Sequence, residues 1–118
     1  MTKELIQETL ESVRDYLPKL ISASETIAQD IQAHQEGWLE TFIAYSRGLE
    51  WLTSAISGIK QIDPELLETV NVHDFVPLFD QLTEAFQHAN YVTVCDLLLY
   101  EVKPLLEGCF VEVQRTLH

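Results

Sequence analysis

The chain has 118 residues, 47% of them hydrophobic and 22% charged, and its formal net charge is −12. This composition predicts a single globular domain over residues 1–118 and excludes a disordered chain. The seven lysines and arginines are scattered along the sequence. We therefore expect no nucleic-acid partner and no anionic membrane surface, because both need clustered positive charge.

The first predicted helix covers residues 2–35, with Thr2 as its N-cap. Pro18 lies inside this segment, and because the apolar pattern continues in phase beyond it, we expect a kink rather than an end. Gly37 follows as the left-handed residue that closes the helix. The positions of its heptad-like seam recur at steps of three and four, and they are Ile6, Leu10, Val13, Leu17, Leu20, Ser24, Ile27, Ile31 and His34.

The second predicted helix covers residues 38–60 and starts a seam in a new phase, which indicates a turn before Trp38. Gly48 lies inside this helix, where glycine costs about 1 kcal/mol relative to alanine. We expect Gly48 to allow a close approach of two helices. The seam consists of Trp38, Phe42, Tyr45, Leu49, Leu52, Ile56 and Ile59.

A short helical connector is predicted over residues 63–70, because Asp63-Pro64-Glu65 combines a cap, a proline at the first position and an acid in the first turn. A third main helix is predicted over residues 73–88. Its cap is Asn71 or Asp74. The brief link after it predicts that the next helix is an antiparallel neighbour.

The most apolar stretch runs over residues 90–107 and predicts a central helix that continues to about residue 116, with a bend at Pro104. Wound at about 100° per residue, its apolar side chains cover most of the circumference. Glu101 falls inside this apolar arc, between the directions of Leu97 and Leu105. A buried carboxylate needs a partner, so we expect Glu101 to pair inside the protein or to lie in an interface.

The two cysteines, Cys95 and Cys109, are predicted on one helix about 21 Å apart, too far for a disulfide. We expect buried free thiols in a reducing compartment. The first fifteen residues contain no apolar segment typical of a secretory signal, and no apolar run is long enough for a membrane span. These patterns predict a cytoplasmic protein.

Gly48-Leu49-Glu50-Trp51 is the first of two elements that resemble a group of uncharacterised small helical proteins of Bacillota. The second has Asn90 and Leu99 where that group has Asp and Glu, and its matching positions are Tyr91, Val92, Asp96, Leu97, Leu98, Tyr100, Glu101, Pro104, Leu105 and Leu106. The resemblance covers about a third of the chain. It implies an all-helical fold and carries no activity.

Chemistry-bearing patterns are sparse. Asp30/His34 and Glu84/His88 are pairs spaced by four residues, but the Glu-x-x-His signature of di-metal bundles is missing. Neither cysteine has a neighbouring histidine or a Cys-x-x-Cys partner, and there is no glycine-rich phosphate loop. We therefore expect no enzyme activity, no cofactor and no metal. A carboxylate–histidine metal bundle stays open as an alternative from another class.

The sequence predicts an all-α, antiparallel four-helix bundle with kinked long helices and a short extra helical connector. We expect a non-enzymatic protein–protein interaction module, a scaffold or adaptor, with a homodimer as its first assembly. A small export or flagellar-type chaperone is the alternative among binding proteins, an analogy of size, charge and fold. The predicted interface residues are Trp51, which lies off its seam, together with Arg47, Glu50 and Glu101.

Overall fold

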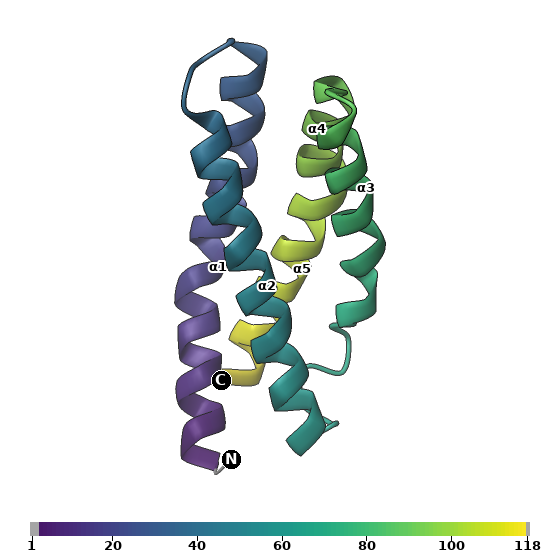
Figure 1. Ribbon diagram of the computed structural model, residues 1–118. Helices are drawn as coiled ribbons and strands as arrows, with labels where there is room; N and C mark the ends of the chain where they lie inside the picture. The colour runs from purple at the N-terminus through teal and green to yellow at the C-terminus, as the bar shows by residue number, and fades with distance from the viewer. Residues whose placement is uncertain (1–2, 118) are drawn as a thin grey trace.

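The computed structural model describes residues 3–117, which fold into four antiparallel helical segments without a strand in that range (Figure 1). The predicted all-α bundle is confirmed. Thr2, predicted as an N-cap, lies outside the described residues. The segments are α1 (Lys3–Gln32), α2 (Trp38–Ile62), α3 (Val76–Gln87), and a fourth formed by α4 (Tyr91–Leu97), the π-helical turn η2 (Leu98–Val102) and α5 (Lys103–Leu117).

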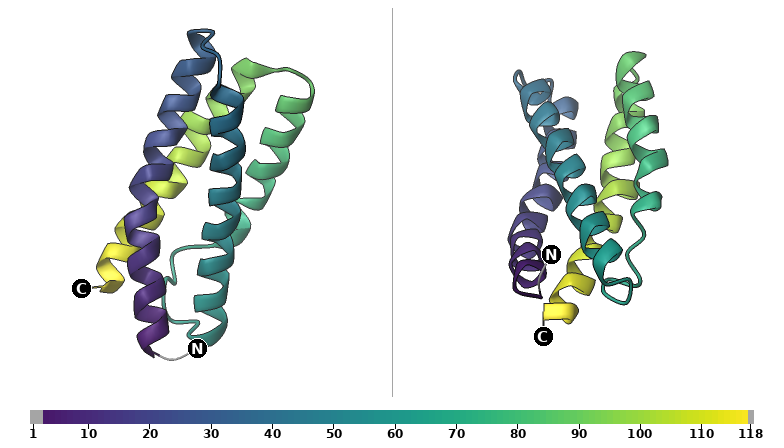
Figure 2. Two further views of the ribbon diagram at one scale, coloured as in Figure 1. Left: turned by 60° about the vertical axis from the view of Figure 1, so that its left-hand side comes forward. Right: turned by 60° about the horizontal axis from the view of Figure 1, so that its bottom comes forward.

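The predicted seams face the core, and α1 contributes the longest row of buried side chains. Helix α1 runs through Pro18 and packs against α2 and along the fourth segment (Figure 2). Every seam position from Ile6 to Ile31 is buried, including Ser24. His34 is the exception: it is exposed in the turn after α1 and has a φ of +55°. Gly37 has the expected left-handed conformation, with a φ of +89°, but it is the N-cap of α2 and does not close α1, which ends at Gln32.

The predicted connector helix is displaced along the chain. Residues 64–69 form turns, and the short helical piece is instead the 3-10 turn η1 (Val72–Asp74). Leu67 explains the difference, because its side chain is buried while its φ is +54°, a value incompatible with a right-handed helix. The Asn71 side chain accepts a hydrogen bond from the His73 amide at 3.0 Å and caps η1. Lys60 holds the connector through a hydrogen bond to the Val70 carbonyl.

The fourth segment contains a π-helical turn that the sequence did not predict. The Lys103 amide donates to the Leu98 carbonyl, five residues back, directly before Pro104. Such a wide turn inserts one extra residue and changes the phase of the helix. The prediction of a buried Glu101 is therefore wrong: Glu101 is exposed, and Leu98, Val102 and Leu106 face the core.

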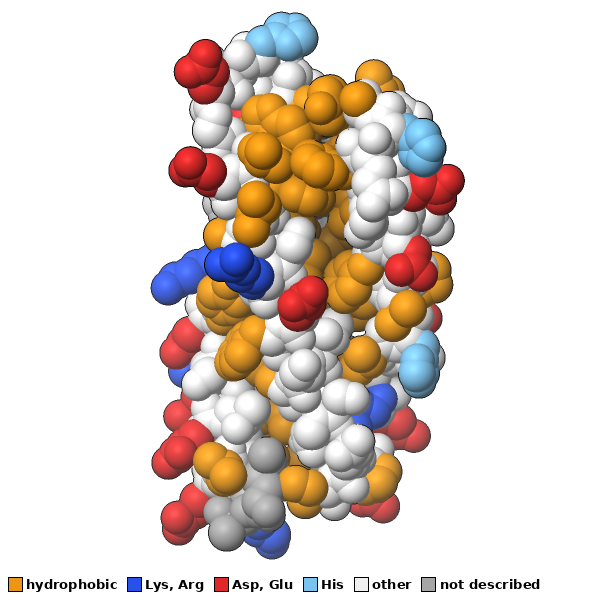
Figure 3. Space-filling model, in the orientation of Figure 1, with side chains coloured by type: hydrophobic (Ala, Val, Ile, Leu, Met, Phe, Trp, Pro, Cys, Tyr) orange, Lys and Arg blue, Asp and Glu red, His pale blue; other side chains and the backbone are white. Residues whose placement is uncertain are grey.

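Aromatic rings fill the space between α2 and the hairpin of α3 and α4. Phe42 stacks on Phe86 with a centroid distance of 5.6 Å and an interplanar angle of 11°. Trp38 makes edge contacts with both of these rings and with Tyr91, at centroid distances of 5.3–6.4 Å. In Figure 3, hydrophobic side chains gather over the upper part of α2 and the adjoining gap. None of the described helices has the length and apolarity to cross a membrane.

Candidate functional site

The structure brings two of the four predicted interface residues together. Trp51 is 42% exposed and lines a groove between α1 and α2, which Arg47 also lines. Glu50 is exposed but lines a separate cavity of about 100 Å³ beside α3, next to Phe79. Glu101 is exposed on the fourth segment and lines neither. Only the α2 pair therefore defines a common surface.

The groove runs along the outer face of the α1/α2 hairpin as two adjoining hollows of about 620 and 470 Å³. Ser12 and Trp51 line both hollows, so they mark the middle of the groove. On each helix its residues are spaced mostly by three or four positions, with some adjacent pairs such as Arg47 and Gly48, and this spacing places them along one face of the helix. From α1 these include Leu5, Glu8, Ser12, Asp15, Tyr16 and Lys19, and from α2 they include Ala44, Arg47, Gly48, Trp51 and Ala55.

Gly48 shapes the wall of the groove. A Cβ built at this position would overlap the hydroxyl of Tyr16 and come within 3.0 Å of the Leu20 side chain. The missing side chain therefore lets Tyr16 lie across α2, and the predicted close approach at Gly48 is confirmed. The Tyr16 ring in turn meets Trp51 edge to face, with a centroid distance of 5.4 Å and an interplanar angle of 88°. This contact holds Trp51 in place while part of its ring stays accessible.

Positive charge at one end of the groove is unpaired. Lys19 and Arg47 line the same hollow, and within residues 3–117 neither has a hydrogen-bond or ion-pair partner. Asp15 also lines this hollow, but its carboxylate is paired with Arg14. Most other lysines and arginines have a partner. Three form ion pairs, which are Arg14–Asp15 at 3.0 Å, Lys103–Glu25 at 2.6 Å and Arg115–Glu112 at 3.1 Å, and Lys60 donates a hydrogen bond to a backbone carbonyl. Figure 3 shows Lys and Arg side chains close together over the middle of the α1/α2 hairpin. In a protein of net charge −12, two free cations beside an accessible tryptophan point to a binding surface.

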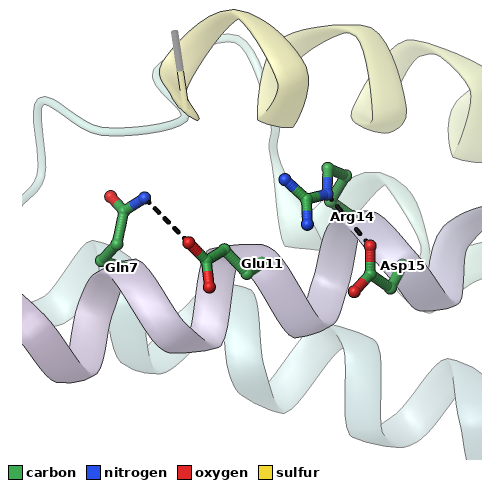
Figure 4. Close-up of polar contacts among 4 residues, drawn as sticks. All are labelled: Gln7, Glu11, Arg14 and Asp15. Atoms are coloured by element: carbon green, nitrogen blue, oxygen red, sulfur yellow. Dashed lines mark hydrogen bonds and ion pairs between the residues drawn. The ribbon is translucent and has the colours of Figure 1, made fainter.

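The opposite end of the groove carries negative charge. Glu8 lines the second hollow and has no partner among the described residues. Two other acids of α1 are occupied on their own helix (Figure 4): Glu11 accepts a hydrogen bond from Gln7 at 3.2 Å, and Asp15 is paired with Arg14. The groove therefore carries opposite charges at its two ends. Glu8 lies about one helical turn before Ser12, and Lys19 lies about two helical turns after it.

Buried polar groups elsewhere serve packing. The Ser24 hydroxyl donates to the Leu20 carbonyl at 3.0 Å and lies 2.6 Å from the Tyr45 hydroxyl. Because the one hydroxyl proton of Ser24 is used by Leu20, Tyr45 is the donor of the second bond. Burial raises the pKa of Tyr45 well above its usual range, and the bond to Ser24 opposes this rise. The pair links α1 to α2 inside the core.

Both thiols are buried and free. Burial, reinforced by the negative charge of Glu112, raises the pKa of Cys109 to about 12. The pKa of Cys95 is also raised, by desolvation and then by Asp96. A nucleophilic cysteine requires the opposite shift, because the thiolate is the reactive form. Neither thiol has the electrostatic environment of an activated nucleophile.

The histidine–carboxylate pairs remain separate in space. Residues 3–117 contain no group of three or more side chains from His, Cys, Asp and Glu that could hold a metal ion. In the second pair, Nδ1 of His88 lies 2.9 Å from the backbone carbonyl oxygen of Glu84 rather than beside its carboxylate. That ring nitrogen therefore has a backbone partner.

Sequence reasoning missed the half of the groove that α1 supplies. Tyr16 and Lys19 follow Ser12 at four- and seven-residue spacings, and Glu8 precedes it by four. This spacing marks a second face of the helix beside the buried seam. Its small and polar residues carried no hydrophobic signal, so only the position of α2 shows that the face belongs to a groove.

A family model described as "Domain of unknown function (DUF8042)" matches residues 8–109. The match includes α2 and α3 in full and parts of the first and fourth helical segments, with both sides of the groove from Glu8 onward. No curated protein and no solved structure matches the chain.

Proposed function

The chain belongs to the DUF8042 family, whose description assigns no activity, and from its groove we propose a non-enzymatic protein–protein interaction module. In this proposal the protein is a cytoplasmic scaffold or adaptor that binds a helix of another polypeptide along the outer face of α1 and α2. The observation that carries the proposal is Trp51, held against Tyr16 yet 42% exposed, in the middle of the groove. The narrower assignment to Bacillota, with the two elements quoted above as family motifs, is part of the same proposal.

Three features of the groove favour a helical protein segment as its ligand. Its wall contains the small residues Ser12, Ala44 and Ala55, over which a backbone can approach closely. Its aromatic pair supplies an anchor of the type that dominates binding energy at interfaces. Its charged ends supply the polar rim that fixes the orientation of a partner.

Site-specific photo-cross-linking tests this proposal on the full chain in its native cells. Ala44 is exposed in the groove, and replacing it with benzoylphenylalanine puts the reactive group beside a bound partner. We expect a cross-linked protein product from position 44. Glu68, exposed in the connector, is the control position and should give none. If position 44 gives no more product than position 68, the proposal is wrong.

A single substitution measures the contribution of the anchor. We expect Trp51→Ala to weaken the association by about 2 kcal/mol, or about 30-fold, because truncating an aromatic anchor removes most of its contact area. The same change at Glu101, Glu101→Ala, should alter it less than twofold, because Glu101 lies outside the groove. Identification of the cross-linked protein then separates an adaptor from an export or flagellar-type chaperone, whose product would be a secreted protein.

A further inference from the structure

We propose that the occupant of the groove is a second copy of this chain, bound antiparallel about a two-fold axis. This inference rests on the proposed function and adds the identity of the partner. It is carried by the charge pattern of the groove, in which a free acid at one end and free cations at the other make the surface complementary to itself. A two-fold interface requires that property, because the same patch is used on both subunits.

The charges have the geometry that this arrangement needs. Glu8 and Lys19 are eleven residues apart on α1, which is about 1100° of winding, within about 20° of three full turns. They therefore lie on the same face of the helix, about 16–17 Å apart along its axis. Arg47 lines the same hollow as Lys19 and adds its charge at that end.

A two-fold axis through the middle of this span pairs the opposite charges. The midpoint between Glu8 and Lys19 falls at residues 13–14, beside Ser12, which lines both hollows with Trp51. Rotating a second copy by 180° about an axis that crosses α1 at right angles at this point brings its Glu8 to Lys19 and Arg47 of the first copy. The reverse pair forms by symmetry. The accessible ring of Trp51 then lies near the centre of the interface, where binding energy is concentrated.

The alternative orientation is disfavoured by the same charges. A parallel arrangement sets Glu8 against Glu8 and the cations against cations, and like charges facing each other across an interface are strongly unfavourable. At physiological ionic strength charges are screened beyond about 8 Å. Screening therefore weakens the long-range repulsion between two acidic chains, whereas the ion pairs within the groove act over shorter distances and are retained.

Sedimentation equilibrium of the purified full chain in 0.15 M salt tests the dimer. We expect a monomer–dimer equilibrium that each single reversal, Lys19→Glu or Glu8→Lys, weakens at least about tenfold. The double variant Glu8→Lys/Lys19→Glu exchanges the two charges. It should bind at least about threefold more tightly than either single variant, whereas merely additive structural damage would make it weaker than both.

Arg115→Glu is the matched control, because it changes the net charge as Lys19→Glu does but lies on α5, outside the groove. It should leave dimerisation within about twofold of the original chain, and helix content measured by circular dichroism should be equal in all variants. A monomeric original chain, or a double variant no tighter than the single ones, would overturn the dimer.

The cross-link from position 44 separates failure of the dimer from failure of the proposed function. A product formed by two copies of this chain supports both. A product formed only with a different protein overturns the dimer and leaves the interaction module intact. The absence of any product above the control position overturns both.

Discussion

The two sides of α2 are packed in different ways. Toward α1 the contact is close, with Gly48 accommodating Tyr16 and a buried hydrogen bond joining Tyr45 to Ser24. Toward the α3/α4 hairpin the space is wide and is filled by stacked and edge-on rings, with Phe42 on Phe86 as its centre. The right-hand view in Figure 2 shows the α1/α2 pair beside the α3/α4 pair.

This difference explains where the candidate site lies. On the wide side, large aromatic side chains point inward and fill the volume between the helices, and the burial of their rings stabilises the fold. On the close side, a Cβ at Gly48 would overlap Tyr16, so the absence of a side chain there leaves room for the Tyr16 ring. Tyr16 crosses α2 at this point, meets Trp51 on the outside of the hairpin, and lines the groove with it. Three predictions test the comparison through the free energy of unfolding.

The largest effect is expected on the wide side. Phe42 is 8% exposed and contacts both Phe86 and Trp38, so Phe42→Ala should leave a cavity and cost about 3 kcal/mol. Urea denaturation followed by circular dichroism measures the change. Leu39→Ala, an exposed position on the same helix, is the control and should cost less than about 1 kcal/mol. A loss below 1 kcal/mol for Phe42→Ala would show that the rings cover the core without supporting it.

An intermediate loss of stability is expected on the close side, and it should differ between the two partners of the Ser24–Tyr45 hydrogen bond. Ser24→Ala strands the buried hydroxyl of Tyr45 without an acceptor and should cost about 2 kcal/mol. Tyr45→Phe removes the donor, while Ser24 keeps its bond to the Leu20 carbonyl, so the cost should be about 1 kcal/mol. The same denaturation experiment compares the two variants. Equal costs would contradict the assignment of Tyr45 as donor.

The smallest effect is expected at Gly48. Gly48→Ala gains about 1 kcal/mol of helix propensity but must displace the Tyr16 ring, so the net change should lie within about 1 kcal/mol of zero. Gly58 lies on the same helix with nothing within 4 Å of a built Cβ, and Gly58→Ala should show a gain of about 0.5–1 kcal/mol. The difference between the two variants gives the free energy of the close approach. A full gain at both positions would mean that Tyr16 moves without cost.

The main helical seams could be predicted because burial of one face imposes a period on the sequence. The positions from Ile6 to Ile31 and from Phe42 to Ile59 follow that period and are buried. Glu101 could not be placed, because its direction depends on the π-helical turn before Pro104, and winding at a constant angle assumes that no such turn exists. The connector was misplaced because Leu67 is buried through a left-handed backbone that no local pattern marks.

Only the α2 side of the candidate site could be predicted, because the sequence does not show which helices lie side by side. Trp51 and Arg47 were identified because an aromatic residue off its seam is visible in one helix alone. Tyr16, Lys19 and Glu8 were missed, because a solvent-facing stripe acquires meaning only from the helix beside it. The role of all these residues at an interface stays a prediction that the groove variants test.

The sequence by itself determined the class of the fold, the number of long helices and the buried seams of α1 and α2, because each of these follows from hydrophobic periodicity along one segment. Only the tertiary structure decided that α1 and α2 approach closely at Gly48, that Glu101 faces solvent, and that free charges of opposite sign lie at the two ends of one groove. These features depend on distances between segments far apart in the chain, and periodicity within a segment contains no information about such distances.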